Sequence, residues 1–150
     1  MQNAEPIWDV VERRKPAYAA LADRVFATPE LLYAEEKSCA EHMAMLKAEG
    51  FRVRQNPAGI PTAVIGEAGE GGPVIAILGE YDALPGLSQE PGVAEHKPVE
   101  PGGAGHGCGH NLLGAASLLA AAAVKEWIEQ TGAQATIRYY GCPAEEGGAA

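Results

Sequence analysis

Residues 111–130 constrain the fold most, because they would make a helix that is apolar on nearly every side. Leucines, an alanine run, Val124 and Ile128 leave no broad polar face for water, so this helix has to be buried against other structure. Asn111 is a suitable N-cap residue, and Gly132 is a suitable C-terminal stop. Its uninterrupted apolar part, Leu112–Val124, covers only about three helical turns, which is too short to cross a membrane.

Two strand patterns flank this helix. The unbroken apolar run Val74–Leu78 is typical of a strand buried on both faces, and Thr136–Tyr140 predicts a second strand after the helix. Residues 85–109 between the first strand and the helix are rich in glycine and proline, as in a long functional loop. Strand, loop, helix and strand in this order predict a parallel βαβ unit.

The rest of the chain completes an α/β pattern. Helical spacing is found over residues 7–26, with Pro16 as a kink or break, and over residues 35–49, which Gly50 ends. Short strands are expected at residues 51–54 and 62–66. The predicted fold class is therefore α/β, with a largely parallel central sheet flanked by helices.

Charge and cysteine content exclude several classes of protein. The net charge is −9, with 20 acidic and 11 basic residues, and no stripe of Lys or Arg could follow nucleic acid or an anionic membrane. Met1–Val10 has no basic segment followed by an apolar run, which favours a cytoplasmic location. The three cysteines are an odd number with irregular spacing, so no disulfide framework is expected, and Cys39 is predicted to lie in the core.

Polar residues with metal-binding chemistry follow the predicted strands and precede the predicted helix. They are Glu80 and Asp82, then His106, Cys108 and His110, then Glu145 and Glu146. All of these positions lie at the carboxyl edge of a parallel sheet, where α/β proteins place their sites, so the side chains should converge. His42, in a charged helix, and His96, in the long loop, are predicted to be solvated.

The segment Gly105–His110 is the strongest sign of metal binding. Its alternating glycines let the backbone wrap tightly while thiolate and imidazole side chains, both ordinary zinc ligands, face a common centre. Of the adjacent carboxylates Glu145 and Glu146, one can bind metal while the other faces a water molecule as a general base. Asp82 can bind metal, orient a ligand or cap a loop. The alternative is a non-catalytic structural metal module that uses His106, Cys108, His110 and Cys142.

Three motifs then stand in the order of a known family. They are Gly79-Glu80-Tyr81-Asp82-Ala83-Leu84-Pro85, Gly105-His106-Gly107-Cys108-Gly109-His110-Asn111 and Pro143-Ala144-Glu145-Glu146-Gly147-Gly148. They resemble the metal-dependent amidohydrolase and carboxypeptidase family, which includes hippurate hydrolases, indole-acetyl-amino-acid hydrolases and aminobenzoyl-glutamate hydrolase, and the resemblance is strongest to the last branch. It implies a zinc-peptidase-like catalytic domain, of which residues 1–150 are the N-terminal portion, without an inserted dimerisation domain.

The resemblance also implies roles for individual residues. Cys108, His110 and Glu146 would bind metal, Glu145 would be the general base, and Asp82 would support the site. The implied enzyme hydrolyses the amide bond of N-acyl or aroyl amino acids with a metal-activated water. It holds two Zn or Mn ions and forms a homo-oligomer through the dimerisation domain, and the 150-residue chain alone is expected to be inactive.

The chain departs from the family pattern at two positions. Asn111 occupies a position where many relatives have Asp, and Glu80 stands where more distant carboxypeptidases have a ligand His. The resemblance therefore leaves the role of Glu80 open.

Overall fold

The computed structural model describes residues 5–148, so the first four residues of Met1–Val10, the segment that favours a cytoplasmic location, lie outside it. The described residues form helices and strands in the order α1 (Glu5–Phe26), α2 (Glu36–Ala48), β1 (Arg52–Gln55), η1 (Pro57–Gly59), β2 (Val64–Glu70), β3 (Val74–Glu80), α3 (His110–Thr131), β4 (Ala135–Cys142) and η2 (Glu145–Gly147). All of the predicted helices and strands are present, with boundaries shifted by a few residues, and η1 and η2 are short 3-10 helices.

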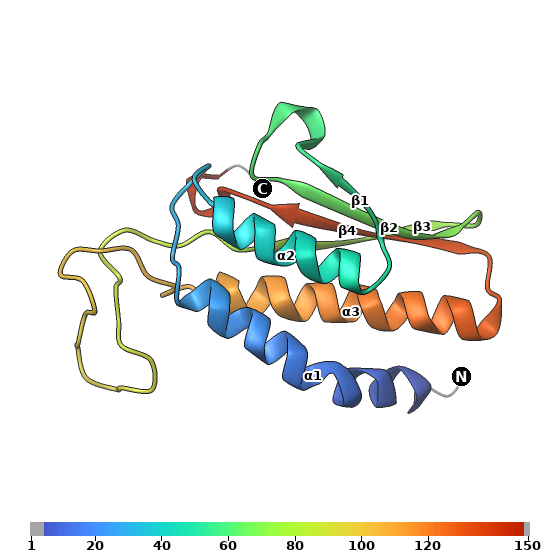
Figure 1. Ribbon diagram of the computed structural model, residues 1–150, viewed down its shortest axis with the longest axis horizontal. Coiled ribbons are helices and arrows are strands. Elements are labelled where there is room, and N and C mark those ends of the chain that lie inside the picture. The colour runs from blue at the N-terminus through green and yellow to red at the C-terminus, as the bar shows by residue number, and fades with distance from the viewer. Residues whose placement is uncertain (1–4, 149–150) are drawn as a thin grey trace.

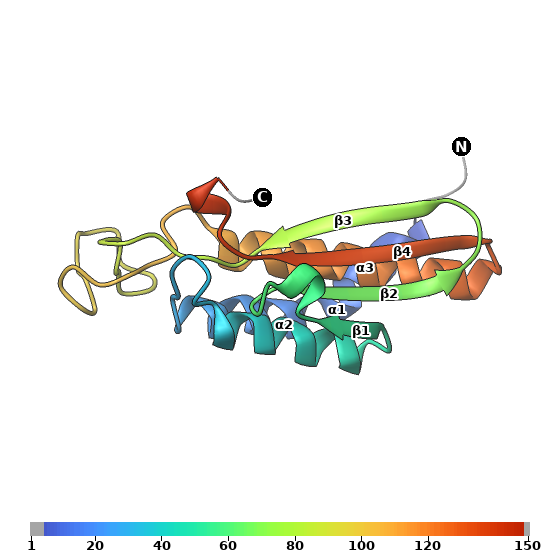
Figure 2. The ribbon, with the colours of Figure 1, turned by 90° about the horizontal axis from the view of Figure 1, so that it is seen from above.

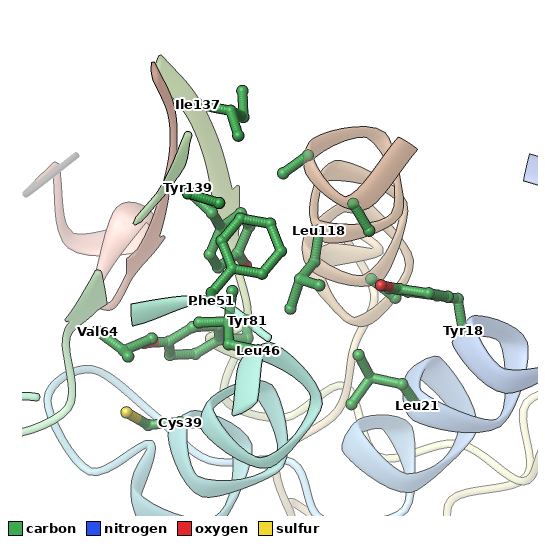
Figure 3. Close-up of a cluster of buried hydrophobic side chains, with 14 of the residues drawn as sticks. Tyr18, Leu21, Cys39, Leu46, Phe51, Val64, Tyr81, Leu118, Ile137 and Tyr139 are labelled. Carbon is green, nitrogen blue, oxygen red and sulfur yellow. The ribbon is translucent and has the colours of Figure 1, made fainter. Parts of the chain in front are cut away.

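The three α-helices form one layer on one face of the sheet. Figures 1 and 2 show this layer, and within the described residues no helix covers the other face, so the prediction of flanking helices holds for one face only. Between the layers lies the apolar core, in which Leu46, Leu118, Ile137 and Tyr139 are fully buried (Figure 3). Cys39 is also buried there, as predicted.

The sheet is mostly antiparallel, and the prediction of a largely parallel sheet is wrong. Its strand order is β1-β2-β4-β3, in which only β3 and β4 are parallel, as the βαβ unit predicts. The reason lies in the connection from β2 to β3, which is only residues 71–73 long. So short a connection reverses the chain, so β3 runs antiparallel to β2. β4 is parallel to β3 and lies between these two strands.

A glycine makes this crossing possible. The connection passes the start of β4, where the Thr136 amide donates a hydrogen bond to the Pro73 carbonyl at 3.0 Å. Gly72 has φ +57, and a Cβ there would lie 1.7 Å from the Gln134 carbonyl oxygen. Close backbone contact therefore requires a glycine at position 72.

Strand β3 lies at the edge of the sheet, and the prediction that it is buried on both faces is wrong. Its side chains Val74, Ile75 and Leu78 are 55%, 44% and 53% exposed. Among the described strands β3 has a neighbour on one side only, and helices cover only one of its faces (Figure 2). An unbroken apolar run therefore indicates a strand but does not indicate which of its faces the fold covers.

Helix α3 is the core helix. It contacts α1 on one side and β3 and β4 on the other, and although it is long and apolar enough to cross a membrane, half of its most apolar stretch is buried inside the protein. It begins at His110 after Gly109, which has φ 99, so the predicted cap at Asn111 is wrong. Asn111 instead donates a hydrogen bond to the Ala22 carbonyl of α1 at 3.2 Å. Gly132, with φ 68, ends the helix as predicted.

His42 on α2 is fully buried, so the prediction that it is solvated is wrong. It shares a helix face with Cys39 and Leu46, at three- and four-residue spacing, and this face packs into the core. Its Nδ1 lies 2.9 Å from the Tyr139 hydroxyl. Burial lowers the pKa of His42 to about 3, so the imidazole is neutral in the folded protein.

Candidate metal centre

Four elements of the fold meet at one end of the sheet. β3 and β4 both end there, α3 begins there, and η2 follows β4 directly (Figures 1 and 2). This convergence follows from the parallel pairing of β3 and β4, because parallel strands end at the same edge. It brings together the five predicted site residues and one whose role the sequence leaves open: Asp82, Cys108, His110, Glu145, Glu146 and Glu80.

His110 is the centre of this group, and its side chain is only 5% exposed. Its Nδ1 lies 2.8 Å from Oδ1 of the buried Asp82, and because a carboxylate oxygen accepts, Nδ1 is the donor. Nε2 lies 3.3 Å from an oxygen of Glu80 and 3.6 Å from an oxygen of Glu145. Asp82 therefore orients the imidazole so that its free nitrogen faces carboxylates, as second partners of metal-binding histidines do.

Two sets of potential metal ligands share this histidine. Cys108, His110 and Glu146 offer ligand atoms within 4.8 Å of one another, and so do Glu80, His110 and Glu145. The first set is the ligand set that the family resemblance implies. The second set brings in Glu80, which lies at the end of β3.

Negative charge dominates the site. Burial raises the pKa of Glu80, and the nearby Glu145 and Asp82 raise it further, while His110 opposes this rise. A hydrogen bond with Glu146 is the main cause of the raised pKa of the Cys108 thiol. Carboxylates and a thiol therefore lie close together here, and a bound cation would favour their ionised forms.

The residues fit a divalent metal ion. Imidazole, thiol and carboxylate groups are the ligands that zinc and similar ions prefer. Oε1 of Glu146 is buried and has no hydrogen-bond partner among the described residues, although buried polar atoms normally have one. This oxygen lies 3.9 Å from Nδ1 of His110 and is free to bind a cation.

His106 and Cys142, which the alternative module needs, belong to neither ligand set. Nε2 of His106 lies 3.2 Å from the Val25 carbonyl, to which it donates, and the ring lines a hollow of about 540 Å³ beside the long loop. The Cys142 thiol lies 3.6 Å from the Tyr140 carbonyl, and burial raises its pKa. The described residues therefore do not assemble the four-ligand structural site.

An α/β sheet edge that gathers a histidine, a thiol and several carboxylates defines the class of protein as one with a candidate divalent-metal site. Comparison with known proteins gives the family. Residues 76–150 match the family described as Peptidase family M20/M25/M40, and this match covers half of the chain. The chain belongs to this family, which confirms the resemblance of its three motifs.

Relatives and solved structures agree with this assignment. The chain is 52% identical over 141 residues to one of the subunits of p-aminobenzoyl-glutamate hydrolase of Escherichia coli, covering 93% of the chain and 29% of that protein. The YXEP protein of Bacillus subtilis, a dinuclear metal-binding peptidase from the M20 family, has a TM-score of 0.72 and 26% identity, covering 90% of the chain and 36% of that structure. An aminobenzoyl-glutamate utilization protein from Klebsiella pneumoniae shares the fold, with a TM-score of 0.64 and 15% identity, covering 94% of the chain and 40% of that structure.

Sequence reasoning missed one residue near the site. Glu35 is fully buried before α2, and its carboxylate contacts the backbone that carries Glu145. The sequence offers only an acidic pair, Glu35-Glu36, at the start of a helix, which normally indicates a favourable charge at an exposed N-terminus.

Proposed function

We propose that this chain is the N-terminal portion of the catalytic domain of a longer metal-dependent amidohydrolase. Its substrates are N-acyl or aroyl amino acids, and the similarity to a component of an aminobenzoyl-glutamate hydrolase favours an aroyl amino acid. The chain spans only 29% of that relative, so the complete enzyme would draw further site residues from other segments. A cytoplasmic location and a homo-oligomer remain predictions.

One observation carries the proposal. His110 donates a hydrogen bond from Nδ1 to Asp82 and turns Nε2 toward carboxylates, with Cys108 and Glu146 close by. Cys108, His110 and Glu146 would hold a zinc or manganese ion, and Glu80 is available as a ligand to a second ion. A divalent ion at such a site lowers the pKa of water and polarises the substrate carbonyl.

Glu145 is suited to the role of general base. Its side chain is 38% exposed, compared with 20% for Glu146, so its carboxylate reaches solvent at the edge of the site. A carboxylate there can take a proton from an attacking water molecule and pass it to the amine that leaves. Glu146 is held more tightly, because its own amide donates to Asp82 at 2.9 Å.

Replacement of Glu145 by glutamine in the longer protein tests this proposal. The amide cannot accept the proton but fills the same space, so we expect metal content to stay unchanged and release of amino acid from aminobenzoyl-glutamate to fall at least about 100-fold. Metal is measured by atomic absorption and product by chromatography. Glu70→Gln, an exposed position on β2, is the matched control and should keep full activity. Full activity of Glu145→Gln would rule out Glu145 as the base.

A further inference from the structure

Glu35 links two distant segments through one carboxylate oxygen. Its Oε1 accepts hydrogen bonds from the amides of Tyr33 at 3.0 Å and Ala144 at 2.9 Å. The side chain is fully buried, and its other oxygen has no partner among the described residues. None of the ion pairs within residues 5–148 includes Glu35, so its contacts are with backbone amides and not with a cation.

Both amides belong to residues in an unusual backbone conformation. Tyr33 has φ 60 and Ala144 has φ 61, in the left-handed region that residues other than glycine seldom occupy. Such conformations persist only where the surroundings hold them. The Glu35 carboxylate is the group that holds the Ala144 amide, directly before Glu145.

A second carboxylate anchors the other side of Glu145. Asp82 Oδ2 accepts the Glu146 amide at 2.9 Å, while Asp82 Oδ1 contacts the His110 ring. The short helix η2 is therefore fixed at Ala144 by Glu35 and at Glu146 by Asp82. The direction in which the Glu145 side chain leaves the backbone therefore depends on both Glu35 and Asp82.

We propose that Glu35 is a positioning residue that sets Glu145 and Glu146 at the correct distance from His110. This inference rests on the proposed function for the role of the metal ion, but the anchor itself can be tested without metal. Glu35 belongs to neither set of potential ligands among the described residues, and it acts through the backbone of Ala144. A buried carboxylate with no cation partner is costly, and this positioning role accounts for its presence.

Hydrogen exchange in the longer wild-type protein, without metal, tests the anchor. We expect the amide of Ala144 to exchange at least about 100-fold more slowly than a free amide, because this N–H group is buried and donates a hydrogen bond to Glu35. Exchange at the rate of a free amide would overturn the proposal. This measurement needs no variant, so a free-amide rate would overturn the anchor even if replacement of Glu35 prevents folding.

Cobalt binding tests the consequence for the site. Glu35→Leu removes the acceptor, and we expect the affinity for Co²⁺ to fall at least about 10-fold, with altered visible absorption bands from the cobalt ligands. Glu35→Gln keeps one acceptor oxygen and should restore affinity to within about three-fold of the wild type. Glu36→Gln, an exposed neighbour, is the matched control and should bind like the wild type.

The outcomes separate the two proposals. A folded Glu35→Leu protein with wild-type cobalt affinity and spectrum would overturn the positioning role. Failure of the wild-type protein to bind Co²⁺ would instead refute the proposed function, while protection of the Ala144 amide would still support the anchor.

Discussion

His42 shows how one buried side chain can set the acid stability of the whole protein. Its pKa is about 3 in the folded chain, compared with 6.5 for an unburied histidine. Between these two values the unfolded chain binds a proton that the folded chain does not. The free energy of unfolding should therefore fall by about 1.4 kcal/mol for each pH unit as the pH drops from 6.5 toward 3, and His42 should contribute no pH dependence above 6.5.

Urea unfolding at a series of pH values, in wild type and His42→Gln, measures this contribution. Glutamine does not titrate and can still pair with the Tyr139 hydroxyl, so the variant should lose stability less steeply below pH 6.5. His96→Gln, in the exposed loop, should leave the slope unchanged. Equal slopes in wild type and His42→Gln would contradict the assignment of a neutral His42.

Helix α3 contacts the end of β3 at Gly114, and this contact predicts how a larger residue there would change stability. A Cβ on Gly114 would lie 2.3 Å from the Glu80 carbonyl oxygen and 2.8 Å from Cε1 of His42. Gly114→Ala should therefore lower the free energy of unfolding by about 1–3 kcal/mol through overpacking. It should do so although alanine favours a helix by about 1 kcal/mol over glycine.

Thermal unfolding followed by circular dichroism compares this variant with Gly132→Ala. Gly132 lies at the other end of α3 with φ +68 and nothing within 4 Å of its added Cβ, so it should lose only about 1 kcal/mol of backbone preference. A Gly114→Ala protein as stable as the wild type would show that α3 can shift away from β3 without cost.

The elements themselves were predictable from local pattern, but the antiparallel pairing of β1 and β2 and the strand order were not. The apolar face of α3 and the run Val74–Leu78 define a βαβ unit, and β3 and β4 are parallel as that unit requires. The position of β4 between β2 and β3 depends on the distance that residues 71–73 can span. Neither hydrophobic periodicity nor secondary-structure propensity indicates that distance. The burial of His42 was missed because its helix also carries many charged residues.

The sequence predicts which residues gather at the candidate site, but it does not predict how their side chains are oriented. Residues after β3, before α3 and after β4 had to meet at one edge, and they do. The orientation of His110 by Asp82 depends on side-chain distances that spacing cannot give. Glu35 was missed because it acts through a hydrogen bond to a backbone amide 109 residues away.

At the scale of the whole molecule, the exposed apolar side chains of β3 predict self-association of the 150-residue chain. Val74, Ile75 and Leu78 stand exposed on a strand that is paired on one side only among the described strands, and such edges pair with other chains. Sedimentation velocity should show an average mass that rises with concentration. Leu78→Lys places a charge on this edge and should shift the chain toward monomer, whereas Val99→Lys, 72% exposed in the loop, should not. A wild-type chain that stays monomeric at high concentration would contradict this prediction.

The place of β4 between β2 and β3 also sets an order of events during synthesis. β1 and β2 can pair as soon as both have left the ribosome, because they are neighbours in sequence and in the sheet. β3 cannot, since its partner for Val74 is Thr136, and all of the long loop and α3 must be translated first. Until β4 has been translated, the apolar strand β3 has no pairing partner among the described strands. Chaperones bind segments of this kind. The sheet edge and the metal ligands beside it therefore form together, once β4 and η2 have been translated.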